Sequence, residues 1–256
     1  MTGLCRRVLS RTTAAAGFAA LLLAGVIAPA AAQSAEQIIR RMEENQTHRT
    51  ARIEGRMEIR DRFGRRTSTF ISWSEGADKA LVEFTSPAER GQKVLRTEDE
   101  IYLYYPDAAE LIRLQGAALR DSLLGSDVSY EDMTGNRGLL ASYRVSVAGT
   151  ETVNDRRCYV VELEARTRDV AYPRQKLWVD AEQYVMRRAE QYALSGRLLK
   201  VMEVEETMRR DGKIFPSRIV IMDQLKRNSR TEFIIEEAAI DVSLPPNIFS
   251  LEELRW

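Results

Sequence analysis

The stretch from residue 51 to residue 59 reads ARIEGRMEI and alternates strictly between two kinds of side chain. Small or apolar residues occupy the odd-numbered positions, and charged residues occupy the even-numbered positions between them. Successive side chains of a strand point to opposite faces of a sheet. This pattern therefore predicts a half-buried antiparallel strand with one wet face.

Similar alternation recurs along the rest of the chain. The further strands are expected at residues 66–75, 79–85, 93–97, 101–105, 111–114, 142–149, 157–166, 175–179, 184–192, 198–209, 215–224 and 230–242. Turn-forming residues separate these stretches, and Asp211-Gly212 predicts a type I′ hairpin because both central residues of that turn need positive φ. So many short strands joined by close turns predict one large, strongly curved antiparallel sheet.

Two helical segments interrupt the strand pattern. Ser34 and Gln37 form a capping box in front of a helix expected at Ala35–Glu44. The stretch 115–140 favours a second helix at Ala117–Leu124, followed by a capping box of Ser129 and Asp132. No low-complexity linker or internal repeat divides residues 33–256, so we expect one domain there.

A sheet with one apolar face must cover that face, and these short helices are the cover that the sequence offers. The expected fold class is mainly β with a helical lid (α+β): a strongly curved antiparallel sheet that forms an incomplete β-barrel, covered by short helices over an apolar cavity. The lid residues are Ile38, Ile39, Met42, Leu119 and Leu123. Alternation alone selects as cavity wall Ile53, Met57, Trp73, Val82, Phe84, Leu103, Trp178, Ile219, Ile221 and Phe233. The alternative is that the same side chains fill the interior and leave no cavity.

The first 32 residues have the layout of a secretory signal. Three arginines precede an uncharged apolar run from Ala14 to Ile27, and Pro29 with Ala30–Ala32 follows it. We expect cleavage after Ala32 and export to the periplasm of a Gram-negative cell, with an uncleaved membrane anchor as the alternative. The remaining chain has 35 basic and 38 acidic residues and one cysteine, Cys158, so it cannot form an internal disulfide.

Composition argues against several functional classes. Nucleic-acid binding needs a clear excess of Lys and Arg, and this chain has 38 basic and 38 acidic residues. One histidine, His48, and two cysteines leave little material for a His/Cys metal site or for nucleophilic catalysis. The sequence also lacks the Gly-x-Ser-x-Gly nucleophile elbow. We therefore expect no enzyme, no cofactor and no metal.

The stretch 124–133, LGSDVSYEDM, resembles the Gly-Ser-Asp-x-Ser-Tyr-Glu-Asp signature of the periplasmic outer-membrane lipoprotein-sorting (LolA-like) protein family. Its signature residues here are Gly125, Ser126, Asp127, Tyr130, Glu131 and Asp132. The aromatic stretch 101–106, the stretch LWVD at 177–180 and the run LPPNIFS at 244–250 match the same family in order and spacing. The resemblance implies a half-open antiparallel barrel that is closed by helices and holds acyl chains. It carries no catalytic residue. We interpret the acidic signature residues as helix caps in a solvated loop.

The expected function is a periplasmic carrier that binds lipid or lipoprotein acyl chains and moves them toward the outer membrane. Its partners would be the acyl chains, an inner-membrane transporter and an outer-membrane acceptor. The alternative is a sensing or accessory subunit of an inner-membrane lipid exporter that acts through protein partners. Arg65-Arg66 and Lys226-Arg227 are expected at hairpin tips, where contact with anionic lipid is one interpretation.

Overall fold

The computed structural model describes residues 33–97, 100–134, 138–168 and 170–255. The expected signal peptide at residues 1–32 and its cleavage after Ala32 lie outside these residues. Residues 33–256 form a compact unit of their own. Within the described residues no helix has the length and hydrophobicity that a membrane crossing requires.

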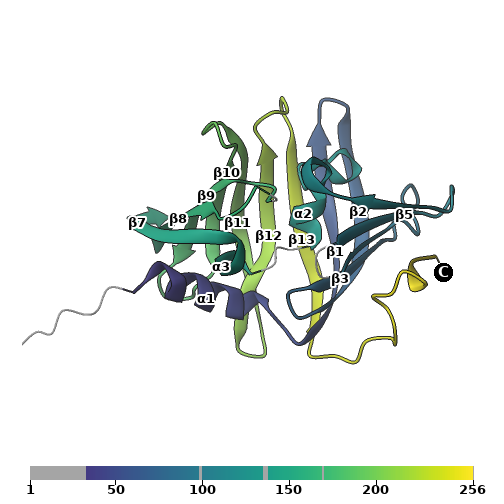
Figure 1. The fold of residues 1–256 in the computed structure, drawn as a ribbon, viewed down its shortest axis with the longest axis horizontal. Coiled ribbons are helices and arrows are strands. Elements are labelled where there is room, and N and C mark those ends of the chain that lie inside the picture. Colours follow the sequence, from purple (N-terminus) through teal and green to yellow (C-terminus); the bar gives the residue numbers. More distant parts are fainter. Residues whose placement is uncertain (1–32, 98–99, 135–137, 169, 256) are drawn as a thin grey trace, which may run out of the picture. The chain divides into compact units, whose positions relative to one another are not determined.

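Thirteen strands are found within the described ranges, and Figure 1 shows their arrangement. Their bounds are β1 Thr50–Asp61, β2 Gly64–Glu75, β3 Lys79–Phe84, β4 Lys93–Thr97, β5 Glu100–Tyr105, β6 Glu110–Leu114, β7 Tyr143–Val153, β8 Arg156–Ala165, β9 Arg174–Asp180, β10 Met186–Tyr192, β11 Leu198–Arg210, β12 Lys213–Asp223 and β13 Arg230–Ile240. The helical elements are α1 Ala35–Gln46, η1 Gly116–Arg120, η2 Leu123–Gly125, α2 Tyr130–Thr134, α3 Leu139–Ser142 and η3 Glu253–Arg255. The mainly β fold that the sequence predicted is confirmed.

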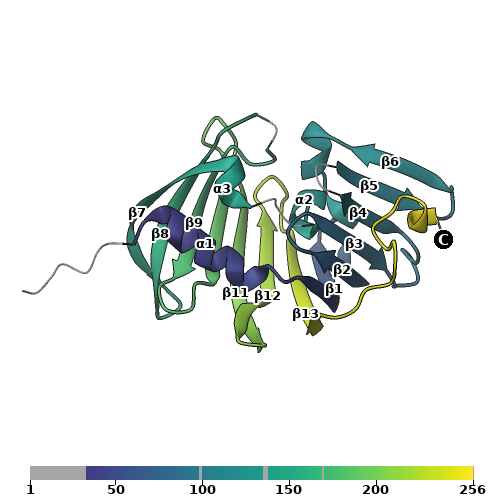
Figure 2. The same cartoon turned by 60° about the horizontal axis from the view of Figure 1, so that its bottom comes forward.

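All thirteen strands belong to one antiparallel sheet with the order β6-β5-β4-β3-β2-β1-β13-β12-β11-β10-β9-β8-β7. The chain builds outward from β1 to the edge strand β6, continues at the other edge with β7, and returns by hairpins to β13 beside β1. The connection between the two edges is the segment 115–142, which we call the insertion. It links opposite edges of the curved sheet, and its described residues Leu119, Leu123, Val128 and Met133 pack against one face of that sheet. Figure 2 shows α1 and α2 on this same side, the inner face.

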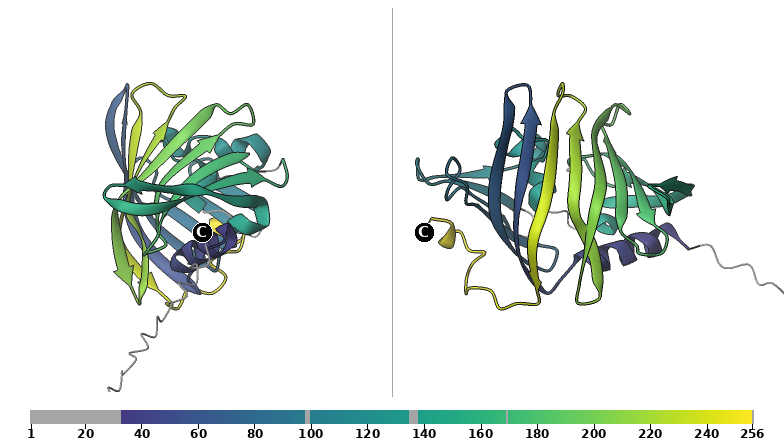
Figure 3. Two further views of the ribbon diagram at one scale, coloured as in Figure 1. Left: turned by 90° about the vertical axis from the view of Figure 1, so that its left-hand side faces the viewer. Right: turned by 180° about the vertical axis from the view of Figure 1, so that it is seen from behind.

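The sheet curves around its inner face, as the left view of Figure 3 shows. Register shifts bend the central strands: β1 against β13 at Glu54/Gly55, and β11 against β12 between Val204 and Thr207. Such bulges increase local twist and turn a flat sheet into a barrel wall. β6 and β7 end the strand order without pairing to each other, so the barrel stays unclosed.

Gly55 provides room for an aromatic pair at the centre of the inner face. The Phe70 ring lies over Gly55 and stacks on Phe233 with 5.1 Å between ring centroids. A Cβ atom at position 55 would lie 2.8 Å from the Phe70 ring and 2.5 Å from the backbone oxygen of Ile234. No side chain larger than hydrogen fits there without a shift of the sheet.

The expected helix at Ala117–Leu124 is wrong. The chain forms two separate 3₁₀ turns there, η1 and η2, and Leu124 has a positive φ of 52°. A left-handed residue cannot continue a helix, so the apolar side chains of this segment are presented by turns. The helix at the N-terminus is confirmed and runs two residues further, to Gln46, with both bonds of the Ser34–Gln37 capping box present.

Gly55→Ala is expected to lower the free energy of unfolding by about 1–3 kcal/mol, because the added methyl group overpacks the β1–β13 seam. Urea unfolding of the single variant measures this loss. In a double-mutant cycle, Phe70→Leu should recover part of it, since one of the two close contacts is with the Phe70 ring. A Gly55→Ala variant as stable as the parent would contradict the close packing described here.

Candidate functional site

A continuous apolar surface covers the inner face of the sheet at the β1–β5 end. Eight of the ten expected wall residues belong to this cluster or pack against it. They are Ile53, Met57, Val82, Phe84, Leu103, Ile219, Ile221 and Phe233. The insertion contributes Leu119, Leu123, Val128 and Met133 from above, so the expected lid residues Leu119 and Leu123 face the expected wall residues.

The two tryptophans assigned to the wall lie on the other, outer face of the sheet. Trp73 is in register with Leu81, which in turn pairs with Leu95, and the C-terminal residues Phe249 and Leu254 cover this row. Trp178 packs with Cys158 and Val160, and its indole donates to Glu151 at 2.8 Å. Their assignment to the inner face is therefore wrong. Alternation defines two faces for each strand, but it does not identify which of them is the inner one.

Helix α1 covers a second apolar cluster on the inner face of β7–β10. Ile38, Ile39 and Met42, the expected lid residues, are buried against side chains such as Val161 and Leu177. Polar contacts fix both sides of the helix: Asn45 donates to the carbonyl of Gln183 at 2.8 Å, and Glu43 accepts from the backbone of Leu139 in α3. The helix is thus tied both to the sheet and to the insertion.

Between the two clusters the inner face is apolar but only half-buried. Met202 packs against both clusters, and Ile219, Phe233 and Ile53 stay partly exposed. On the outer face the same strands carry charged ladders, such as Arg218 with Glu232 and its neighbours. We call Met202, Ile219 and Phe233 the apolar strip. It lies on the inner face of β11–β13, between α1 and α2, and it is partly exposed.

The signature loop is buried, which corrects the interpretation of a solvated loop. Asp127 is 2% exposed. Its carboxylate accepts from Ser229 Oγ and Thr231 Oγ1 at 2.9 Å each and from the backbone N–H of Asp223 at 3.2 Å. Thr231 lies 104 residues away in the sequence, so local pattern could not reveal this contact.

The neighbouring carboxylates Glu131 and Asp132 form ion pairs with basic side chains from opposite halves of the sheet. Glu131 pairs with Arg96 of β4 at 3.2 Å, and Asp132 pairs with Lys200 of β11. We call these two buried ion pairs the clamp. Asp132 also completes the predicted capping box with Ser129, with backbone-to-side-chain distances of 2.9 and 3.1 Å. The capping part of the prediction is confirmed, while the side chains are enclosed.

Burial dominates the electrostatics of the clamp. Burial raises the pKa of Glu131, and Arg96 opposes that rise. For Lys200, burial acts to lower the pKa, but the Asp132 carboxylate and the Tyr172 hydroxyl together more than offset it, so the pKa is raised and the ammonium form is favoured. Burial also raises the pKa of Tyr172, whose ring lies 5.3 Å from Lys200 Nζ, to about 12. A charged Lys200 held by Asp132 is therefore the stable state at neutral pH.

Two amides extend this polar zone along the inner face. Gln175 pairs with Gln191, and Gln191 pairs with Lys200, as direct neighbours on β9, β10 and β11. Gln175 Nε2 and Gln191 Oε1 are buried and make no hydrogen bond within the part of the chain that the structure describes. Burial raises the pKa of the Tyr143 hydroxyl to about 12. The nearby Gln175 amide opposes this rise only in part.

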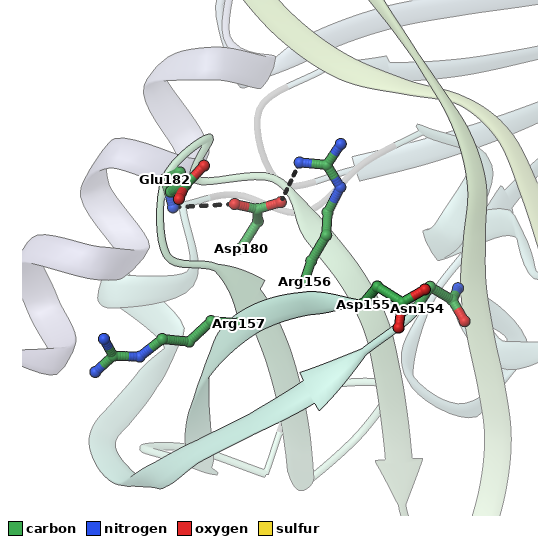
Figure 4. Close-up of a pocket in the computed structure, with 6 residues that line it drawn as sticks. All are labelled: Asn154, Asp155, Arg156, Arg157, Asp180 and Glu182. Atoms are coloured by element: carbon green, nitrogen blue, oxygen red, sulfur yellow. Dashed lines mark hydrogen bonds and ion pairs between the residues drawn. The ribbon is translucent and has the colours of Figure 1, made fainter.

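Two pockets of the described part lie outside the apolar interior. One, of about 290 Å³, is formed by the β7–β8 and β9–β10 turns, and Figure 4 shows Asp180 there between Arg156 and the backbone N–H of Glu182, with Arg157 directed away. The other, of about 580 Å³, lies mainly along outer-face side chains of β7–β10, among them Arg144, Glu164, Arg174 and Lys176. Neither is the expected apolar cavity, which stays a prediction.

No three His, Cys, Asp or Glu side chains of the described residues gather closely enough to hold a metal ion. The described interior offers apolar contacts from the two clusters, with the clamp as its charged border.

Three solved structures share this architecture and define its class as an unclosed antiparallel half-barrel. A DUF1329 family protein of Desulfovibrio piger is 24% identical, with 85% of this chain and 96% of that chain covered and a TM-score of 0.78. A putative outer membrane lipoprotein-sorting protein domain from Vibrio parahaemolyticus is 20% identical, with 87% and 100% covered and a TM-score of 0.78. A LolA superfamily protein from Nitrosomonas europaea is 24% identical, with 87% and 100% covered and a TM-score of 0.75.

A family model described as an uncharacterized protein matches residues 76–256, which is more than half of the chain. No curated protein sequence matches the chain. The chain belongs to the family that this model describes. Its fold is that of the solved lipoprotein-sorting and LolA superfamily proteins, as the resemblance at residues 124–133 implied.

Asp132→Asn is expected to lower the free energy of unfolding by about 3–5 kcal/mol, because it leaves the buried Lys200 ammonium without a counter-charge. Adding Lys200→Met should restore most of the loss, since Asn still caps α2 and the uncharged side chain still packs. The matched control is Glu75→Gln in the exposed Lys79–Glu75 pair, which should cost less than about 1 kcal/mol. Equal losses in urea unfolding for Asp132→Asn and Glu75→Gln would show that the clamp contributes no more than a surface pair.

Proposed function

We propose that this protein carries lipid or lipoprotein acyl chains through the aqueous periplasm. The observation that supports the proposal most is the half-buried apolar strip of Met202, Ile219 and Phe233 on the inner face, between α1 and α2. A water-exposed apolar strip is unfavourable in the free protein, and a guest acyl chain would cover it. The lipoprotein-sorting structures of the same fold agree with this role.

The binding strength follows from the length of hydrocarbon that is shielded. Each buried methylene contributes about 0.8 kcal/mol, so ten methylenes give roughly 8 kcal/mol before association costs. That corresponds to a complex of about micromolar affinity. A carrier needs this range, because it must extract its cargo from one membrane and release it to another.

Access to the strip requires its cover to move. Helix α1 is held by apolar contacts and by side-chain hydrogen bonds such as those of Asn45 and Glu43. The insertion is held by the clamp, by Thr134, which accepts from Arg96 Nε at 3.2 Å, and by the anchoring of Asp127. Helix α1 is thus the more easily displaced cover, and the lid role belongs mainly to it in this proposal.

The proposal includes the route as well as the cargo. The chain would be exported by a signal peptide that is cleaved after Ala32, would receive acyl chains from an inner-membrane transporter and would deliver them to an outer-membrane acceptor. The lipoprotein-sorting relatives support the periplasm as the compartment. The role is binding and transfer rather than catalysis.

Native mass spectrometry and chloroform extraction of the protein purified from periplasm test the proposal. Lipid-mass adducts that extract into chloroform are the expected result. A stable complex with another protein and no bound lipid would instead support the sensing or accessory role, and would contradict carriage.

Met202→Gln and Ile219→Gln together are expected to weaken binding of a fluorescent fatty acid by about tenfold, because amide groups then replace two parts of the apolar strip. The matched control is Glu203→Gln with Glu205→Gln, which places the same amides on the outer side of β11. Circular dichroism and urea unfolding establish that both double variants are folded. Equal fatty-acid affinities in the two variants would place the binding site elsewhere.

A further inference from the structure

Three neighbouring hairpin turns expose large apolar side chains at one end of the sheet. They are the β1–β2 turn with Phe63 (80% exposed), the β10–β11 turn with Leu194 (75%) and the β12–β13 turn with Leu225 (54%). Register places them together, because Ile59 pairs with Thr231 and Lys200 pairs with Asp223 close to these turns. Figure 1 shows all three turns along its upper edge, and the right view of Figure 3 shows them from behind.

These turns are also rich in positive charge. They carry five exposed arginines and, in the segments 62–67, 193–197 and 224–229, all of which the structure describes, no acidic residue. The arginines are Arg62, Arg65, Arg66, Arg197 and Arg227. The guanidinium of Arg62 lies 4.6 Å from the centre of the Phe63 ring, so charge and apolar surface are presented together.

The turns are held in place rather than merely exposed. Asp61 accepts from the backbone N–H of Phe63 and from Arg66, both at 2.7 Å. Arg66 also donates to the carbonyl of Leu124 at 2.9 Å, and Lys226 donates to that of Gly125 at 3.2 Å. The tips of β1–β2 and β12–β13 are thus braced against the signature loop.

The opposite end of the strands has another character. Its turns contain the acidic residues Asp78, Asp155, Glu182 and Asp211 beside exposed cations such as Arg157, Arg209 and Arg210, so positive charge there is mixed with negative charge. The other two large apolar side chains that are exposed among the described residues, Val147 and Leu251, lie on β7 and in the C-terminal segment. Among the described residues, exposed apolar turn residues next to arginines therefore occur at the end with the β1–β2, β10–β11 and β12–β13 turns.

We propose that this end, the three turns with Phe63, Leu194 and Leu225, docks on an anionic lipid surface. Apolar side chains on separate tips can each enter the fluid headgroup layer, whereas the surrounding arginines bind its phosphates. A protein partner would have to match three separate protrusions at once and would also have to supply the compensating negative charge. The inference goes beyond acyl carriage and does not depend on it, because it concerns the outer tips and not the interior.

Docking at this end would bring the signature loop to the membrane surface. Arg66 and Lys226 connect two of the tips to the carbonyls of Leu124, Gly125 and Ser126. The insertion that crosses the inner face would then pass close to the lipid surface from which a guest could enter.

Vesicle flotation with purified residues 33–256 tests the proposal. We expect the protein to float with vesicles of phosphatidylcholine and phosphatidylglycerol in equal parts, to stay unbound with phosphatidylcholine alone, and to detach as salt increases. Arg62→Gln, Arg65→Gln and Arg227→Gln together should weaken partitioning roughly a hundredfold. The matched control, Arg157→Gln with Arg209→Gln and Arg210→Gln, removes the same charge from the opposite end and should leave partitioning within about threefold of the parent.

A second pair of variants tests the apolar contribution. Phe63→Ser with Leu194→Ser should weaken flotation by at least tenfold, and Val147→Ser with Leu251→Ser should leave it unchanged. Absence of binding to the anionic vesicles at low salt would overturn the proposal, as would equal losses for the tip and control arginines. Unchanged flotation of the tip variants, together with loss of a cross-link to an envelope protein in cells, would identify a protein interface and also overturn it.

Discussion

The pairing of β1 with β13 is the constraint on which the rest of the structure depends. It joins residues 51–60 to residues 230–240, so the first and last strands meet at the centre of the sheet. The strands from the middle of the chain, β6 and β7, then lie at its two edges. The insertion connects these two edges, and its described residues pack on the inner face. The part of the cover that the insertion provides thus follows the strand order, whereas α1 is held over the interior by its own apolar and side-chain contacts.

This topology also explains why charged side chains are buried in an otherwise apolar interior. A short segment that spans two halves of a sheet offers little apolar area, and helix α2 has only five residues. Two consecutive carboxylates on that helix reach Arg96 on one side and Lys200 on the other. Buried ion pairs contribute little net stability compared with apolar packing of the same volume, but they are strongly directional. They specify where the insertion lies, which apolar contacts alone leave variable.

Much of the fold follows from the sequence, because its dominant signal is local. The two-residue period located all thirteen strands, and the Asp211-Gly212 turn has the positive φ values that a type I′ hairpin needs. The same signal does not show which face of each strand points inward. Trp73 and Val82 both fit the alternation of their strands, yet only Val82 faces inward. The buried state of Asp127 depends on Thr231, and the outer row at Trp73 is covered by the distant Leu254. Contacts across a hundred or more residues carry no local period, so neither outcome could be deduced.

The positive φ at Leu124 explains why the predicted helix at Ala117–Leu124 does not form, and it also shapes the site. The sequence predicted a continuous helix over Ala117–Leu124, whereas the chain forms η1 and η2 and presents the Leu124 and Gly125 carbonyls to Arg66 and Lys226. Leu124 lies within η2 and, with the following Gly125, has a left-handed backbone that turns the chain. The carbonyls of Leu124 and Gly125 accept from Arg66 and Lys226 of the hairpin tips, while Leu123 remains buried. One backbone reversal therefore separates two environments: a charged margin at the end of the barrel and an apolar interior behind it. The cargo that we propose has the same division, with a polar head and a hydrocarbon tail, so the proposed carrier function predicts its orientation from that division.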